Sequence, residues 1–291
     1  MMKKKAIIEY FLPILGYIAV IVLFAIIVTI FGEGVTTFKE YSLWKFLTGI
    51  SWRPTASPPK FGSVPLLVST LIVAGTAMLV AVPLALAAAI YIAKLSNAFT
   101  KEVLKPIVEL LASIPSVVYG FFGIVFMAPL VQKIFHLPIG QTGFTAGIIL
   151  AFMALPTIAS ISEDAITAVS KDVEEASLGL GASRAETLIH IVIPAAMPGI
   201  ITAVSLGFGR AIGETMTVLM VAGGALGMPH SIFSPMRPIT ATIAAEMGET
   251  PVGSLHYHAL FALAVELFLI VVVFNVIAEY YHEKFSHMGK A

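Results

Sequence analysis

Long apolar stretches separated by shorter polar segments follow one another along the whole chain. Six of these stretches reach the roughly 20 mostly apolar residues that a helix needs to cross a bilayer. They lie at about Leu12–Phe31, Val64–Ala93, Pro106–Phe135, Thr142–Ile161, Ala195–Gly223 and His258–Tyr281. Since an apolar chain segment inside a bilayer must satisfy its own backbone hydrogen bonds, the pattern predicts an all-α integral membrane protein with six transmembrane helices.

Composition removes the other broad classes. Hydrophobic residues make up 58% of the 291 positions, charged residues only 12%, and the mean hydropathy is +0.96. A soluble domain carries about 25% charged residues, so a water-soluble fold is excluded. The formal net charge of zero argues against a nucleic-acid partner. The absence of cysteine excludes disulfides, thiolate metal sites and cysteine nucleophiles.

Lysine and arginine predict the orientation, because cytoplasmic segments carry an excess of them. With the N-terminus in the cytoplasm, the inside segments hold ten: Lys3, Lys4, Lys5, Lys94, Lys101, Lys105, Lys171, Arg184, Lys284 and Lys290. The outside segments hold six: Lys39, Lys45, Arg53, Lys60, Lys133 and Arg237. Both termini are therefore predicted to be cytoplasmic.

Two regions are predicted along the chain. Residues 1–63 form an N-terminal transmembrane helix and a long external loop. The apolar run after the first lysines is too long for a signal peptide and contains no small-residue cleavage site, so we expect this helix to be retained. Residues 64–291 form a core of five transmembrane helices with a charged cytoplasmic loop near 162–193.

The cytoplasmic loop has the most specific spacing in the chain. From Glu174 it reads EEASLGLGASRAETLIHIVIPAAMPG. Carboxylates suit the start of a helix, Gly181 permits a turn, and Pro194 would end or bend a second short helix beginning at Arg184. A helix–turn–helix outside the bilayer implies a docking partner. The alternative is a charged loop that only caps helices, which the spacing described next disfavours.

This loop resembles the coupling loop of ABC importer permeases, written E-A-A-x3-G-x9-I-x-L-P, with Ser177 in place of the second alanine and Ile193 in place of leucine. The resemblance implies the type I permease fold and a loop that docks into a cleft of a cytoplasmic ATPase. It assigns the ATPase contact to Glu174, Glu175, Ala176 and Gly181.

Two charged residues stand inside the fifth apolar stretch. Arg210 and Glu214 are four positions apart, so they would share one helix face, with the Thr215 hydroxyl nearby. A charge at this depth costs roughly 2.5–3.5 kcal/mol on insertion scales. Either the two residues form a packing ion pair, or Arg210 presents its guanidinium to an oxyanion while Glu214 holds it in place.

The surrounding stretch, GRAIGETMTVLMVAGG, resembles the phosphate-importer permeases of the PstC type, whereas the PstA type has Ala-Pro after the equivalent Gly-Glu-Thr. LLASIPSVVYGFFG, ALPTIASISEDAI and MRPITATIAAEMGE extend this resemblance. It implies an ATP-driven importer of inorganic phosphate in a prokaryotic plasma (inner) membrane. It also implies that Arg210 and Glu214 take part in phosphate passage.

The same resemblance implies the partners: a PstA-type second permease, two copies of a PstB-type ATPase and an external PstS-type binding protein. ATP and Mg would sit on the ATPase, because this chain lacks the G-x-x-x-x-G-K-[ST] loop and is not expected to be an enzyme. His256 and His258 lack the further ligands of a metal site.

Three alternatives remain open at the level of sequence. The first is an ABC permease for another oxyanion, such as sulfate, molybdate or phosphonate. The second is an ion-coupled secondary transporter, which would need no ATPase-docking loop. The third is an intramembrane enzyme, for which Arg210 and Glu214 would be a poor acid–base couple.

Overall fold

The computed structural model describes residues 2–288, and side chains over 13–285. Of the lysines used to predict orientation, Lys290 lies outside the described residues, as do the side chains of Lys3, Lys4 and Lys5. Six helices are long and apolar enough to cross a membrane, which confirms the predicted number. They cover Pro13–Glu40, Val64–Leu95, Ser116–Ile134, Gly143–Thr167, Arg184–Gly213 and Leu255–Phe285.

Several spans are built from more than one helical segment. The first, fourth and last are single helices: α1 (Met2–Glu40), α7 (Gly143–Thr167) and α13 (Leu255–Met288). The others contain a π-helical turn, labelled η: α3 (Val64–Ile90) with η1 (Tyr91–Leu95), then α5 (Ser116–Phe122), η2 (Gly123–Met127) and α6 (Ala128–Ile134), and lastly α9 (Arg184–Thr187), η3 (Leu188–Val192) and α10 (Ile193–Gly213).

Short elements connect the spans. They are α2 (Leu43–Thr48), α4 (Ala98–Ala112), α8 (Lys171–Gly179), α11 (Met216–Val221) and α12 (Ile239–Glu246). Strands β1 (Trp52–Arg53) and β2 (Lys60–Phe61) pair antiparallel, so the regular secondary structure of the described chain is helical apart from this small ribbon and one isolated bridge. Trp52 and Phe61 are paired in register and are both buried, which fixes the ribbon against the helices.

Two predicted spans are interrupted where a continuous helix was expected. The third does not begin at Pro106, because the chain leaves the helix at Ser113 and starts α5 only after Pro115. Proline lacks an N–H and disfavours helix in the residue before it, so α4 becomes a separate helix. The fifth ends at Gly213 rather than Gly223, and Glu214 adopts an extended backbone.

Pro194 was expected to end or bend a short helix, and the first of these alternatives is wrong. Arg184–Gly213 is one continuous helix, and the π-helical turn Leu188–Val192 precedes the proline. A proline inside a helix removes one hydrogen bond and crowds the carbonyl four residues before it. The π-helical turn ends directly before Pro194, so the hydrogen bond that the proline cannot make falls where the α-helical hydrogen-bond pattern is already interrupted.

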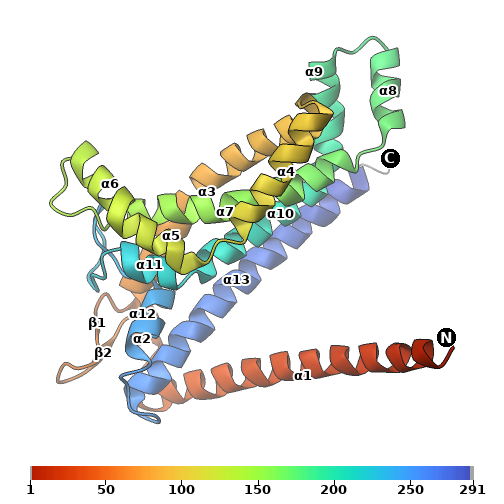
Figure 1. The fold of residues 1–291 in the computed structure, drawn as a ribbon. Helices are drawn as coiled ribbons and strands as arrows, with labels where there is room; N and C mark the ends of the chain where they lie inside the picture. Colours follow the sequence, from red (N-terminus) through yellow and green to blue (C-terminus); the bar gives the residue numbers. More distant parts are fainter. Residues whose placement is uncertain (1, 289–291) are drawn as a thin grey trace.

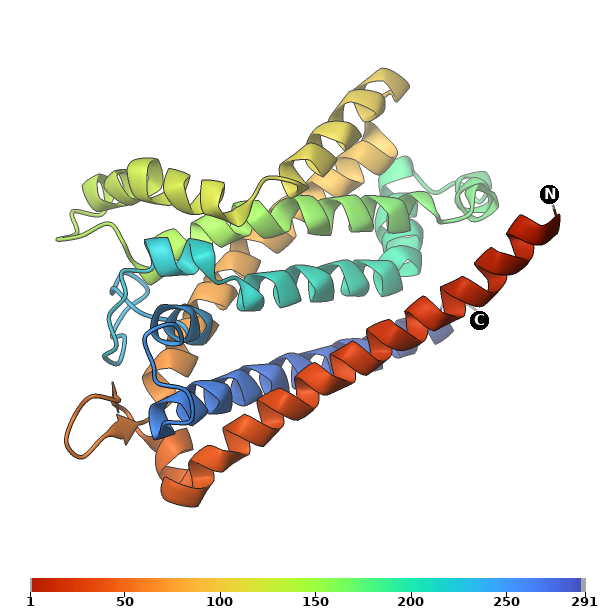
Figure 2. The ribbon, with the colours of Figure 1, turned by 60° about the horizontal axis from the view of Figure 1, so that its bottom comes forward.

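Small residues hold the central helices together. Ala77, Ala81 and Ala85 of α3 are buried, and a Cβ on Gly147 of α7 would come within 2.6 Å of the Thr76 side chain. By contrast, α1 diverges from the bundle and contacts α13 near its own C-terminal end (Figures 1 and 2). The start of α1, the end of α13 and the α8–α9 segment lie at the same end of the molecule.

Candidate functional site

Two interruptions of the helices lie close to each other on a partly exposed side of the chain. One is Ser113–Pro115, between α4 and α5; the other is Glu214–Thr215, between α10 and α11. Helices α5 and α11 pack side by side (Figure 1). They approach closely at Gly120, where a Cβ would lie 2.7 Å from the Met220 sulfur. Broken helices of this kind expose backbone groups that need partners, and membrane proteins tolerate them where they are buried or line a cavity.

Arg210 joins the first interruption to the bundle. Its Nη1 donates to Thr157 Oγ1 of α7 at 3.1 Å, and its Nη2 donates to the Ala112 carbonyl oxygen, at the end of α4, at 3.3 Å. The side chain is half-buried. A guanidinium has five N–H donors, so these two bonds fix its orientation and leave further donors for an anion.

Glu214 does not pair with Arg210, and the predicted shared helix face does not exist. The helix ends one residue earlier, and Glu214 Oε1 instead accepts a hydrogen bond from the Thr217 N–H at 3.1 Å, which caps the start of α11. Its carbonyl accepts from Thr240 Oγ1 at 2.8 Å. Thr215 Oγ1 donates to the Gly213 carbonyl at 3.2 Å, within the same turn.

Thr217 was noted from the sequence only as a nearby hydroxyl and was not assigned to the pathway, but it is part of the site. It is buried, and its hydroxyl donates to the Ser116 carbonyl of α5 at 2.9 Å. Together with Arg210 it ties both interruptions into one polar unit, which we call the two-break site: Ala112–Ser116 and Arg210–Thr217. The adjacent hydroxyls of Thr215 and Thr217 were the available signal, but only the folded chain shows which carbonyl Thr217 reaches.

The predicted coupling loop forms a helical hairpin outside the bundle, α8–α9, at the upper right of Figure 1. Gly181 stands at the turn with φ +93°, a conformation that side-chain-bearing residues avoid. Ser183 and Glu186 form a capping box that starts α9. The helix–turn–helix predicted from the motif is therefore confirmed, and both helices are capped by their own residues.

The residues of the coupling motif make different contacts in the hairpin and therefore have different roles. Glu174 forms an ion pair with Lys94 of η1, so it contacts the bundle of its own chain. Ser177, which replaces an alanine of the motif, lies 2.9 Å from the Thr187 hydroxyl and links α8 to α9. Glu175 has no ion-pair partner within the described part of the chain.

An apolar tip was missed in the sequence. Leu180, directly before Gly181, is 91% exposed, and Val173 and Leu178 on α8 are also exposed. No Cβ contact within 4 Å would limit a side chain at Gly181, so the tip is open on that side. A leucine in an otherwise polar loop outside the membrane was the available signal.

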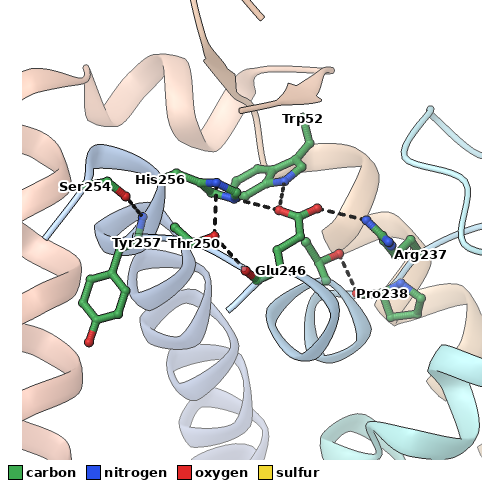
Figure 3. Close-up of polar contacts among 9 residues, drawn as sticks. Trp52, Arg237, Pro238, Glu246, Thr250, Ser254, His256 and Tyr257 are labelled. Carbon is green, nitrogen blue, oxygen red and sulfur yellow. Dashed lines mark hydrogen bonds and ion pairs between the residues drawn. The ribbon is translucent and has the colours of Figure 1, made fainter. Parts of the chain in front are cut away.

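At the opposite end of the molecule, Glu246 connects the β1–β2 ribbon, α12 and the start of α13 (Figure 3). Its carboxylate accepts from Trp52 Nε1 at 3.0 Å and from Arg237 Nη1 at 2.9 Å, and His256 Nε2 lies 2.8 Å from it. His256 thus has a hydrogen-bonding role. No group of three or more His, Cys, Asp or Glu side chains in the described residues is placed to hold a metal.

A second carboxylate fixes α4 near the end of the molecule that holds the α8–α9 hairpin. Glu163 of α7 is 1% exposed and lies 2.7 Å from Lys101 Nζ and 2.8 Å from Lys105 Nζ. Hydrogen bonds to Asp164 and then to Glu163 hold the pKa of Lys105 above its usual range. Lys105 therefore stays charged, and the ion pairs of both lysines with Glu163 fix α4 to α7 just before the first interruption.

Comparison with known proteins places this geometry in a family. The sequence model of the "binding-protein-dependent transport system inner membrane component" matches residues 81–287. The "probable ABC transporter permease protein YqgH" of Bacillus subtilis is 37% identical over 236 residues, 81% of this chain and 76% of the relative. "Phosphate transport system permease protein PstC" of Mesorhizobium japonicum is 37% identical, over 81% and 77%, and that of Haemophilus influenzae 32%, over 80% and 79%.

Solved structures give the same fold. A permease chain from the alginate ABC transporter in complex with its periplasmic protein aligns with a TM-score of 0.64 at 15% identity, covering 97% of both chains. One from the inward-facing MetNI methionine transporter aligns with a TM-score of 0.56 at 20% identity, covering 77% of this chain and 94% of that one. At such identities the likeness concerns the fold alone.

Proposed function

Because the chain belongs to the family of binding-protein-dependent transport system inner membrane components, we propose that it carries inorganic phosphate inward as the permease subunit of an ABC importer. The chain is a membrane-spanning, non-catalytic subunit of the inner membrane. Members of this class work with a second permease, an ATPase and a binding protein. The phosphate assignment is supported by relatives whose names state phosphate transport.

Arg210 is the observation that carries the proposal. Its guanidinium is fixed by Thr157 and Ala112 between two broken helices, with N–H groups free for a ligand. A planar fork of donors matches a phosphate oxyanion better than a point charge does. Since a transporter must also release its cargo, a single oriented cation without a closed cage is appropriate.

Alternating access follows from the connections of the site. ATP and Mg bound to the ATPase would close it, and Glu175, Ala176, Gly181 and the apolar tip would receive that motion. The Lys94–Glu174 ion pair links α8 to the end of α3, so movement of the hairpin reaches the central helices. Glu174 thereby acts as a transmitting residue within the chain.

The finer partners complete the proposal. A PstA-type permease would supply the second half of the pathway, and two copies of a PstB-type ATPase would dock on the hairpins. A PstS-type protein would deliver phosphate to the external loops held by Glu246. Both termini and the hairpin would be cytoplasmic, as the excess of inside lysines indicates.

Phosphate uptake into proteoliposomes tests the proposal. They would contain this chain, the candidate second permease and the ATPase, with the binding protein outside, and sulfate would run in parallel. We expect ATP-dependent phosphate uptake by the wild type. Arg210→Gln removes the charge-assisted contacts, worth about 1.5–3 kcal/mol, and should lower uptake by roughly ten- to hundredfold. Binding of the ATPase should be unchanged.

Three results would contradict parts of this picture. Uptake unaffected by Arg210→Gln would reduce Arg210 to a packing residue. Sulfate uptake without phosphate uptake would replace the substrate. Uptake that needs no ATPase would favour an ion-coupled transporter. Thr157→Val is a matched control, because it removes the hydroxyl that accepts a hydrogen bond from the Arg210 guanidinium but keeps the charge of Arg210. It should lower uptake less than Arg210→Gln.

A further inference from the structure

A carboxyl group lies in the last spanning helix, away from both the two-break site and the hairpin. Glu266 follows Leu255, the first residue of α13, by eleven positions. At 1.5 Å per residue this places it roughly 16 Å along the helix, well inside the candidate span. An ionised group there is costly unless it is paired.

Glu266 lines an apolar pocket between α13 and the α1–α2 corner. The pocket has a volume of about 490 Å³, and Glu266 is the only ionisable residue of its lining. Leu47, Leu269 and Val273 line it and are exposed on the outer surface of this chain. In a bilayer, such a surface meets acyl chains.

The hydrogen bonds around Glu266 suit a neutral acid. Oε1 lies 3.1 Å from Ser63 Oγ, which is also 3.2 Å from the Phe46 carbonyl oxygen. A serine hydroxyl has a single proton to donate. If Glu266 Oε1–H donates to Ser63 Oγ and Ser63 donates to Phe46, both contacts are hydrogen bonds at once. A carboxylate would have one donor at most, and Oε2 is buried with no partner.

No cation compensates a charge at this position. On the α1–α2 corner and the first turns of α13, the titratable groups are Glu33, Lys39, Glu40, Tyr41, Lys45, His256, Tyr257 and His258. Lys39 and Lys45 are exposed, Glu33 lies 2.9 Å from His258, and His256 contacts Glu246. Among the described side chains, no basic nitrogen lies within 4 Å of Glu266.

We propose that Glu266 is a protonated carboxylic acid, forming a proton-binding site that opens toward lipid and reacts with lipophilic carbodiimides. The neutral acid holds the start of α3, through Ser63, against α13. Ionisation would place an unpaired anion in an apolar pocket and loosen this contact. Glu163 is the natural control, since it is a carboxyl group that is only 1% exposed and is paired with two lysines.

Carbodiimide labelling of the full chain in lipid nanodiscs at neutral pH tests lipid access. The acid proton moves to one nitrogen of dicyclohexylcarbodiimide, and the carboxyl oxygen bonds to its central carbon. Acyl migration then gives a stable N-acylurea, with the whole reagent added and nothing released. We expect mass spectrometry to find the adduct on Glu266 and none on Glu163. A water-soluble carbodiimide should leave Glu266 unlabelled, and Glu266→Gln should abolish the adduct.

Difference infrared spectra test protonation without a reagent. Glu266→Gln should lose a carbonyl band of a protonated carboxyl group, whereas Glu163→Gln should lose only carboxylate bands. If Glu266→Gln loses carboxylate bands instead, the residue is ionised and the proposal is wrong. If the acid band is lost but only the water-soluble reagent labels Glu266, the site opens to water, and the lipid-facing part of the proposal is overturned.

Discussion

At the residue scale, the Glu214 side chain has two properties that substitutions can separate: an acceptor oxygen and a negative charge. Its Oε1 caps α11 through the Thr217 N–H, and it does not touch Arg210. Glutamine offers the same acceptor oxygen, so Glu214→Gln should keep phosphate uptake within about twofold of the wild type. Glu214→Leu removes the cap at a cost of about 1 kcal/mol and should lower both stability and uptake. If Glu214→Gln lost as much uptake as Arg210→Gln, the charge itself would be required in the pathway.

The buried carboxylate on α7 gives a second prediction for single residues. Glu163→Gln leaves Lys101 and Lys105 without their shared anion. Both lysine side chains are one-third exposed, so water partly compensates the lost charge. We therefore expect the free energy of unfolding to fall by about 1.5–3 kcal/mol. The melting temperature in detergent should fall by roughly 4–8 °C.

Asp164→Asn is the matched control for that prediction. Asp164 is the next residue and also contacts Lys105, but its side chain is 63% exposed. Exposed ion pairs contribute about 0–1 kcal/mol, so the melting temperature should barely change. Equal destabilisation by the two substitutions would mean that burial of Glu163 does not set the strength of the α4–α7 contact.

The same residues show what a sequence can reveal about a site. Arg210 was predicted because a charge inside an apolar run is conspicuous. The separation of Glu214 from Arg210 was not predictable from local propensity, since Gly-Glu-Thr does not by itself forbid a helix. The break is held by contacts from residues elsewhere in the chain, such as Thr240 on the Glu214 carbonyl, and these exist only after folding.

At the scale of elements, Gly181 tests the hairpin turn. Its φ of +93° is unfavourable for alanine, although no atom lies within 4 Å of the added Cβ. Gly181→Ala therefore changes backbone preference without a clash, at about 1–2 kcal/mol. We expect the affinity for the partner ATPase to fall roughly 5- to 30-fold, as measured by titrating labelled ATPase onto nanodiscs.

Gly179→Ala provides the control within the same hairpin. Gly179 is the last residue of α8, and its added Cβ would also meet nothing within 4 Å. Alanine favours helix over glycine by roughly 0.5–1 kcal/mol, so ATPase binding should be unchanged or slightly tighter. A loss of affinity at both positions would indicate that a methyl group on this surface obstructs the partner, and the backbone explanation would fail.

Elements were predictable where one segment carries its own signal. The hydropathy of each apolar run and the spacing of the hairpin motif are local properties of one segment. Both the six spans and the hairpin are confirmed. The broken third span was less visible, because Pro106 lies inside α4 without ending it while Pro115 does end a helix. The difference lies in the carbonyls freed before Pro115, of which Ala112 accepts from Arg210.

At the scale of the whole molecule, the chain has two distinct polar ends. One end is organised around Glu246, and the opposite end holds the α8–α9 hairpin with the outer ends of α1 and α13. Six spans return the chain to the side on which it began, so these three features must share one side of the membrane. The lysine distribution predicts that this side is the cytoplasm.

Because the chain has no cysteine, single introduced thiols can test that orientation without interference. Leu180→Cys lies at the exposed tip of the hairpin, and Thr55→Cys lies on the exposed turn between β1 and β2, which is predicted to be external. In right-side-out vesicles, a membrane-impermeant maleimide should label Thr55→Cys at once and Leu180→Cys only after permeabilisation; inside-out vesicles should reverse this. Labelling of both thiols from one side would contradict an odd number of spans between them. A reversed pattern would keep the fold, but it would place the hairpin where no cytoplasmic ATPase could reach it, and the importer mechanism would fail.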